Sequence, residues 1–112
     1  NNTCCVTGYK ISSFHNISMI DACHIIPFSE SHDDTIGNGL ALCPNIHRAF
    51  DRELITIDEN YKLTISKEFE ENCDNPFSIK KFDNQKIILP ENIQYAPKLE
   101  NLSWHNQNIF RS

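Results

Sequence analysis

The stretches that decide the fold are residues 21–27 (DACHIIP), 37–43 (GNGLALC) and 47–51 (HRAFD). In the first, His24 stands among apolar residues that predict a buried strand, and Pro27 fixes the end of that strand because proline cannot continue a ladder. In the third, His47 lies about one turn into a predicted helix over residues 44–52, which begins with a proline and repeats apolar residues. A strand end and a helix face can converge, so both histidines are predicted to serve one site.

Asn38 follows His24 after 14 residues, and His47 follows Asn38 after nine. This order resembles the His-Asn-His (HNH) motif of the ββα-metal finger nucleases. The surrounding words CHIIPFSE, NGLALC, HRAFD and ELITID resemble the HNH subfamily written roughly AHI-P-S, NGL-L, H-FD and L-TID. The likeness extends upstream to residues 5–8 and downstream to residues 104–105 and 109–111, so it covers most of the chain.

The resemblance implies both a fold and a reaction. The expected fold is α+β, a ββα-metal (His-Me) finger with an added C-terminal β-hairpin and helix. The expected reaction is hydrolysis of a phosphodiester bond, which needs a base to activate water and a cation to stabilise the leaving oxygen. By resemblance His24 is the general base, Asn38 ties the following loop and orients the base, and His47 is a metal ligand. The ion is expected to be Mg²⁺ or Mn²⁺.

One position departs from the family pattern. Many relatives carry an aspartate or a histidine directly before the base as a metal ligand, and this chain has Cys23 there. A thiolate is a soft ligand poorly matched to Mg²⁺, which favours a packing role for Cys23. Asp51, four residues past His47, could supply the missing ligand as in colicin-type DNases, or it could end the helix and cap the next turn. Asp21 is a weaker candidate, because strand alternation directs residues 21 and 24 to opposite faces.

The five cysteines raise the question of structural zinc. Some HNH proteins hold zinc with two Cys-x-x-Cys pairs. Here Cys5 is followed three residues on by Gly8, and Cys43 is followed by Ile46 where a second cysteine would be expected. Cys4, Cys5 and Cys43 could be neighbours in space, but structural Zn²⁺ is not expected. An odd cysteine count without a secretory signal also disfavours disulfides and predicts a reduced, cytoplasmic setting.

Length supports one domain over residues 1–112, with 39% apolar residues to close a modest core. The chain has no run of 18 apolar residues, so no membrane span is predicted. It begins Asn1-Asn2 without methionine, which suggests a domain cut from a longer protein. In the resembled subfamily this module often stands at the C-terminus, behind a recognition or sensor domain.

The net charge of −5 predicts weak intrinsic affinity for DNA, because surfaces that neutralise phosphates are usually basic. Arg48 and Arg52 lie four apart on the predicted helix and are the candidate nucleic-acid-binding residues. They could line one edge of the cleft, or they could simply be solvated, as arginines on helix surfaces commonly are.

The chain beyond the finger predicts further elements. Apolar residues over 54–57 and 61–65 flank a polar turn, which indicates a β-hairpin. A further strand is expected at 86–89, stopped by Pro90. A final helix is expected at 97–108, with Leu99 and Leu102 facing the core and Trp104 as a further candidate. His105 is expected to pack or cap rather than to catalyse.

These patterns favour a metal-dependent DNA endonuclease domain, placed by resemblance alone in restriction or phage defence. Cleavage of both strands would need two copies, because a single-metal finger cuts one strand at a time. The alternative is a nuclease-derived nucleic-acid or protein binding module that has lost activity, motivated by Cys23 and the acidic charge. A zinc-stapled interaction domain is a third class, disfavoured by the broken cysteine pairs.

Overall fold

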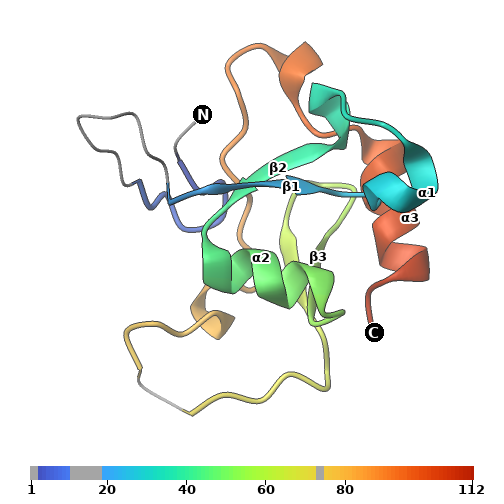
Figure 1. Ribbon diagram of the computed structural model, residues 1–112. Helices are drawn as coiled ribbons and strands as arrows, with labels where there is room; N and C mark the ends of the chain where they lie inside the picture. Colours follow the sequence, from blue (N-terminus) through green and yellow to red (C-terminus); the bar gives the residue numbers. More distant parts are fainter. Residues whose placement is uncertain (1–2, 11–18, 73–74) are drawn as a thin grey trace.

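The described part of the chain, residues 3–10, 19–72 and 75–112 of a computed structural model, is built from two antiparallel β-hairpins and three α-helices (Figure 1). The first hairpin joins β1 (Asp21–His24) to β2 (Gly39–Leu42), with Asp21 opposite Leu42 and His24 opposite Gly39. The excursion between them holds the short helix α1 (Phe28–Ser31) and the 3₁₀ turn η1 (Ile36–Asn38).

Helix α2 (Pro44–Asp51) follows β2 after one residue. Its proline sits in the first turn, where a missing N–H costs nothing and the fixed φ suits a helix. Its buried residues are Ile46, Ala49 and Phe50, while His47 is partly exposed and Asp51 is exposed to solvent. Figure 1 shows α2 packed beside the β1–β2 hairpin, which gives the order strand, strand, helix.

The second hairpin pairs β3 (Ile55–Ile57) with β4 (Leu63–Ile65), and helix α3 (Leu99–Asn108) packs against β3. Two further 3₁₀ turns, η2 (Lys80–Phe82) and η3 (Ile93–Tyr95), lie in the connection to α3. Both hairpins share one apolar core with α2 and α3, whose most buried members include Ile25, Leu42, Phe50, Ile57 and Leu102. The predicted α+β fold, a ββα finger with an added hairpin and helix, is confirmed.

Several boundaries differ from the predictions. The strand expected at 86–89 is wrong: Lys86 forms only an isolated bridge to Lys62, while Ile87 and Ile88 donate backbone N–H groups to Tyr61 and Cys5 on two different segments. A segment that divides its bonds in this way cannot pair as one strand. The final helix begins at Leu99, two residues after Pro97, and Leu99 is exposed while Leu102 is buried. Strand β1 ends at His24, and Pro27 instead precedes α1.

None of the helices in the described ranges is long and apolar enough to cross a membrane.

Candidate metal centre and active site

His47 lies between two carboxylates. On α2 it faces Asp51, one helical turn further on, with 3.0 Å between His47 Nε2 and Asp51 Oδ2. From β1, Asp21 Oδ2 lies 2.8 Å from His47 Nδ1. All three side chains are partly exposed, so the group is open to solvent on one side. Two anionic side chains around one imidazole form a place where a cation is favoured.

Cys23 lies next to Asp51 on the buried side of this group. Its side chain is only 2% exposed, and its Sγ lies 3.9 Å from Asp51 Oδ1. One ligand atom each from Cys23, His47 and Asp51 lies within 4.8 Å of the other two, which is close enough to share a metal ion. Burial, reinforced by the negative charge of Asp51, raises the pKa of the Cys23 thiol well above its usual range.

Strand alternation explains which side chains of β1 reach this group. Asp21 and Cys23 are two residues apart, so both point toward α2, while His24 points to the other side. Asp21, the weaker ligand candidate of the sequence, contacts Nδ1 of His47 and lies outside the group of Cys23, His47 and Asp51. The relevant sequence signal was the spacing of Asp21 from Cys23. Cys23 does pack in the core as predicted, but it also directs its sulfur toward Asp51.

Asn38 fixes both ends of the loop that follows β1. It is fully buried; its Oδ1 accepts the N–H of Ile26, and its Nδ2 donates to the carbonyls of Ile26 and Asp33 at 3.0 and 2.9 Å. The backbone N–H of Ile25 also donates to the carbonyl of Asn38. The loop is thus held by one amide side chain, as the resemblance implied for this position.

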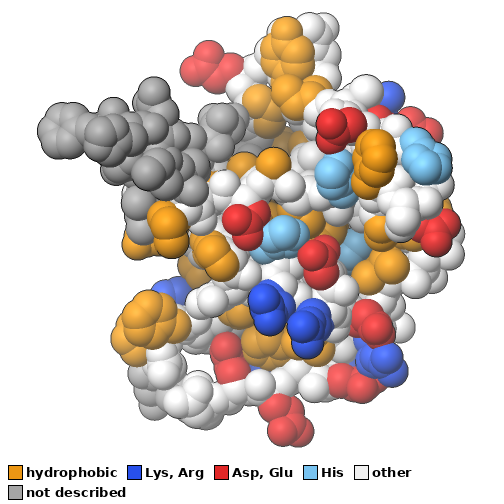
Figure 2. All heavy atoms as spheres, in the orientation of Figure 1, with side chains coloured by type: hydrophobic (Ala, Val, Ile, Leu, Met, Phe, Trp, Pro, Cys, Tyr) orange, Lys and Arg blue, Asp and Glu red, His pale blue; other side chains and the backbone are white. Residues whose placement is uncertain are grey.

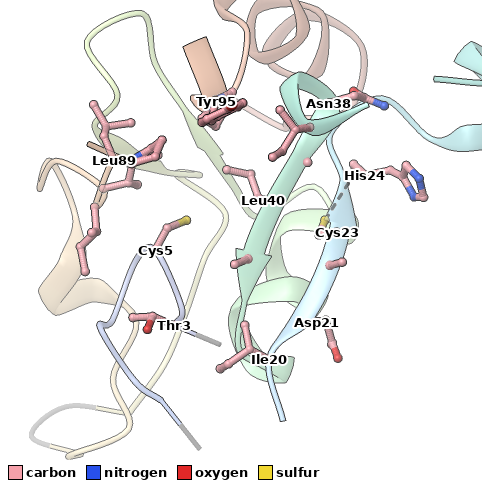
Figure 3. A pocket seen from close by; sticks show the side chains of 18 of the residues that line it. Thr3, Cys5, Ile20, Asp21, Cys23, His24, Asn38, Leu40, Leu89 and Tyr95 are labelled. Atoms are coloured by element: carbon pink, nitrogen blue, oxygen red, sulfur yellow. Dashed lines mark hydrogen bonds between the residues drawn. The ribbon is translucent and has the colours of Figure 1, made fainter. Parts of the chain in front are cut away.

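His24 stands at the end of β1, one residue past Cys23, and its ring extends away from Leu40 and Cys5 (Figure 3). Its Nε2 lies 2.8 Å from Oδ1 of Asp34, and its ring contacts Phe28 of α1 at a centroid distance of 5.6 Å. Asp34 was not anticipated, since only the folded loop brings it to the histidine. His24 is not one of the residues grouped around Asp51, which suits a base that does not ligate the metal.

Arg48 and Arg52 line the same cleft of about 710 Å³ as Asp21, His47 and Asp51. Figure 2 shows basic side chains just beneath acidic and histidine side chains on the face formed by α2 and β1. A second cleft of about 620 Å³ lies between the β1–β2 hairpin and residues 87–97, with Cys5, Leu40, Leu89 and Tyr95 among its walls (Figure 3). The first cleft is the one that combines cationic side chains with candidate metal ligands.

Comparison with known proteins agrees with this geometry. Residues 4–58 match the HNH endonuclease family model. The matched segment contains β1, β2, α2 and β3, and with them the residues around His47 and His24. Comparison with curated proteins gives no significant match.

Among solved structures, the chain is similar to one titled "Modification dependent TagI restriction endonuclease", at 22% sequence identity and a TM-score of 0.65. The similarity covers 96% of this chain and 33% of that one, so this chain spans about a third of the length of the restriction endonuclease that it matches. At this identity the likeness shows the fold, and the family match supports a nuclease at the level of the family.

The side chains present fit a divalent ion. His47, the ligand implied by the resemblance, and Asp51, the candidate named from the helix spacing, both aim a donor atom into one small volume. Asp21 holds the far nitrogen of His47, an arrangement that fixes the ring of a metal-ligating histidine and leaves Nε2 toward the ion.

Proposed function

We propose that this chain is the catalytic domain of a metal-dependent DNA endonuclease that hydrolyses phosphodiester bonds. The observation that carries the proposal is His47 between the carboxylates of Asp21 and Asp51, in a cleft that Arg48 and Arg52 also line. The HNH family match over residues 4–58 supports the same reaction class.

The roles follow from the contacts. Asp34 accepts the N–H of His24 Nε2, which leaves Nδ1 with the lone pair that would take a proton from water. Asn38 keeps the loop carrying Asp34 in register with the end of β1. A divalent ion held by His47 and Asp51 would stabilise the negative charge on the attacked phosphate and on the leaving oxygen. The expected ion is Mg²⁺ or Mn²⁺, as in the resembled family.

Arg48 and Arg52 are proposed to contact DNA phosphates, because they border the cleft in which the scissile group would lie. With a net charge of −5 the domain supplies little further attraction. Sequence recognition is therefore proposed to lie in another part of a longer protein, as the fraction of the matched restriction endonuclease that this chain spans also suggests. A restriction or phage-defence role and a reducing cytoplasmic setting belong to the same proposal.

Nicking of supercoiled plasmid in the presence of a divalent ion tests the proposed function. The parent domain should nick one strand at a time, and double-strand breaks should rise with protein concentration because they need two copies. His24→Ala should lower the rate about 10²- to 10⁴-fold, the usual cost of losing a general base. Metal affinity measured by calorimetry should stay unchanged in this variant, because His24 is not a ligand.

Two outcomes would contradict this scheme. If the alanine variant nicks plasmid at the parent's rate, the role given to His24 is wrong. If the parent binds DNA but cuts nothing with any divalent ion, the chain is the inactive binding module considered as the alternative.

A further inference from the structure

We propose that Cys23 is itself a ligand of the divalent ion, so that this site binds Zn²⁺ or Co²⁺ through sulfur, nitrogen and oxygen in preference to Mg²⁺. The inference rests on the proposed function for the place of the ion and revises its expected ion, which was Mg²⁺ or Mn²⁺. It concerns a residue at which this chain departs from the oxygen or nitrogen donor of its resembled relatives.

The distances from His47 and Cys23 to the two carboxylate oxygens of Asp51 are close to the ligand separations of a tetrahedral site. Zinc bonds of about 2.0–2.3 Å require about 3.4 Å between nitrogen and oxygen ligands and about 3.6 Å between oxygen and sulfur ligands. The corresponding distances are 3.0 Å from His47 Nε2 to Asp51 Oδ2 and 3.9 Å from Cys23 Sγ to Asp51 Oδ1. All three ligand atoms lie within 4.8 Å of one another. Small side-chain adjustments would suffice to close them on an ion.

The donor atoms of Cys23, His47 and Asp51 face one another, and the cation would sit between them. Nε2 of His47 faces a carboxylate oxygen, and because a lone pair and a carboxylate repel, a proton or a metal ion must lie between them. Sγ of Cys23 lies 3.4 Å from the carbonyl oxygen of His24 and 3.9 Å from the other oxygen of the same carboxylate. Binding of M²⁺ would release the thiol proton, and any proton on Nε2, to solvent as the Sγ–M and N–M bonds form.

The backbone holds the donors on two regular elements. Cys23 comes from β1, while His47 and Asp51 come from consecutive turns of α2. Asp21, which orients His47, is also part of β1. Since Cys23 is buried and Asp51 is exposed, the ion would be open on one side only. Three protein ligands with an open position form the arrangement that catalytic zinc sites use for water or substrate.

The donor chemistry decides the preference among ions. Thiolate suits Zn²⁺ and Co²⁺, whereas Mg²⁺ takes oxygen donors in near-octahedral geometry. With Cys23 at the base of the site, Mg²⁺ could use only the carboxylate and the imidazole. The expected order of affinity is therefore Zn²⁺ and Co²⁺ far above Mg²⁺, with the difference arising largely from the sulfur.

Cobalt titration of the whole chain tests the proposal without relying on activity. A thiolate bound to Co²⁺ gives a sulfur-to-cobalt charge-transfer band in the near ultraviolet. We expect the band in the parent protein and its loss in Cys23→Ser. The matched control Cys43→Ser should retain the band, because it alters a partly exposed cysteine that directly precedes α2.

Calorimetry gives the second readout. Asp21→Asn should lose about 10- to 100-fold in Zn²⁺ affinity, the usual cost of removing the residue that orients a metal-ligating histidine. Cys23→Ser should lose more than that, because it removes a ligand. Mg²⁺ affinity should change little in Cys23→Ser. Far-UV circular dichroism verifies that each variant is folded. If Cys23→Ser is not folded, His47→Ala decides, because loss of the band there places the bound thiolate next to His47.

The outcomes separate this inference from the proposed function. Cobalt binding without the band in the parent, or a band that survives in Cys23→Ser and disappears in Cys43→Ser, overturns the role of Cys23 while leaving the nuclease intact. If no divalent ion binds and His47→Ala changes nothing, the metal-dependent function itself fails.

Discussion

His24 has an exposed carboxylate as its partner, which sets the tautomer of its ring. Asp34 Oδ1 lies 2.8 Å from Nε2, and the side chain of Asp34 is 82% exposed. A neutral histidine that donates from Nε2 carries its lone pair on Nδ1, where it can act as a base. Because the pair is solvated, its contribution is modest, of the order of 0.2–1 kcal/mol. Asp34 is therefore a positioning residue, acting through His24.

Asp34→Ala should shift part of the His24 population to the Nδ1–H tautomer and slow plasmid nicking about 2- to 5-fold, the rate equivalent of an exposed pair. The ¹⁵N chemical shifts of the two ring nitrogens, recorded at alkaline pH, report the tautomer directly. Asp34→Asn should restore part of the effect, since an amide oxygen still accepts the N–H.

Glu30→Gln serves as the control, because it removes the same charge from the same loop. Faster nicking in Asp34→Ala would mean that the carboxylate obstructs His24 instead of orienting it.

Individual site residues were predictable only where the spacing is local. The i, i+4 relation of His47 and Asp51 placed both on one helix face, and the structure brings them within 3.0 Å of each other. Asp21 was named only as a weaker candidate, and Asp34 was missed, for different reasons. Asp21 needed the choice of the correct strand face, whereas Asp34 reaches His24 through a loop held by the Asn38 side chain, which no periodicity describes.

At the scale of elements, α3 is attached to the finger through a buried histidine. His105 is only 1% exposed; its Nδ1 lies 2.9 Å from Thr56 Oγ1 on β3, and its Nε2 lies 3.1 Å from the carbonyl of Phe50 on α2. Its ring also stacks on Phe50 at 3.6 Å between centroids. The packing role predicted for His105 is thus a junction of three elements. Burial, opposed by the bond to Phe50, lowers its pKa to about 4.

This lowered pKa makes folding sensitive to acid. In the unfolded chain His105 takes up a proton near the ordinary histidine pKa of 6.5, while in the folded chain it resists protonation until about pH 4. The stability that His105 contributes is therefore complete above pH 6.5 and is lost as the pH falls toward 4, a change on the order of 3 kcal/mol. Urea unfolding across this range should show the slope in the parent.

His105→Gln should be less stable at neutral pH and should lose most of that slope. His32→Asn, a change in an exposed loop histidine at positive φ, should keep it. An unchanged slope in His105→Gln would assign the acid sensitivity to other groups.

The elements follow from sequence to different degrees. Helix α2 and the β3–β4 hairpin were predictable because proline, apolar period and turn residues all agree there. The segment 86–89 reads equally well as a strand, yet its N–H groups go to Tyr61 on one side and Cys5 on the other. That choice depends on the N-terminal segment lying beside it, which only the complete fold supplies.

At the scale of the molecule, the net charge opposes DNA binding, while the residues around the candidate metal site favour it. The formal charge of −5 repels DNA, while Arg48 and Arg52 place two cations at the edge of the cleft that holds Asp21, His47 and Asp51. The two arginines offset this repulsion locally, and an ion in the site would reduce the negative charge further. Because long-range attraction is weak, we propose that residence on DNA depends on a further part of the protein beyond these residues.

The final prediction measures that local contribution. Binding of the isolated domain to a DNA duplex should be weak and independent of sequence, and log K should fall only shallowly with log salt. Arg48→Ala with Arg52→Ala should reduce the salt slope by about 2, because each phosphate contact contributes about 0.9 to it. The double variant Lys62→Ala with Lys86→Ala removes the same charge from residues that do not line the cleft, so it should leave the slope nearly unchanged. Equal effects of the two double variants would mean that the arginines act only through net charge. Tight, sequence-specific binding by the domain alone would overturn the proposal that recognition lies in another part of the protein.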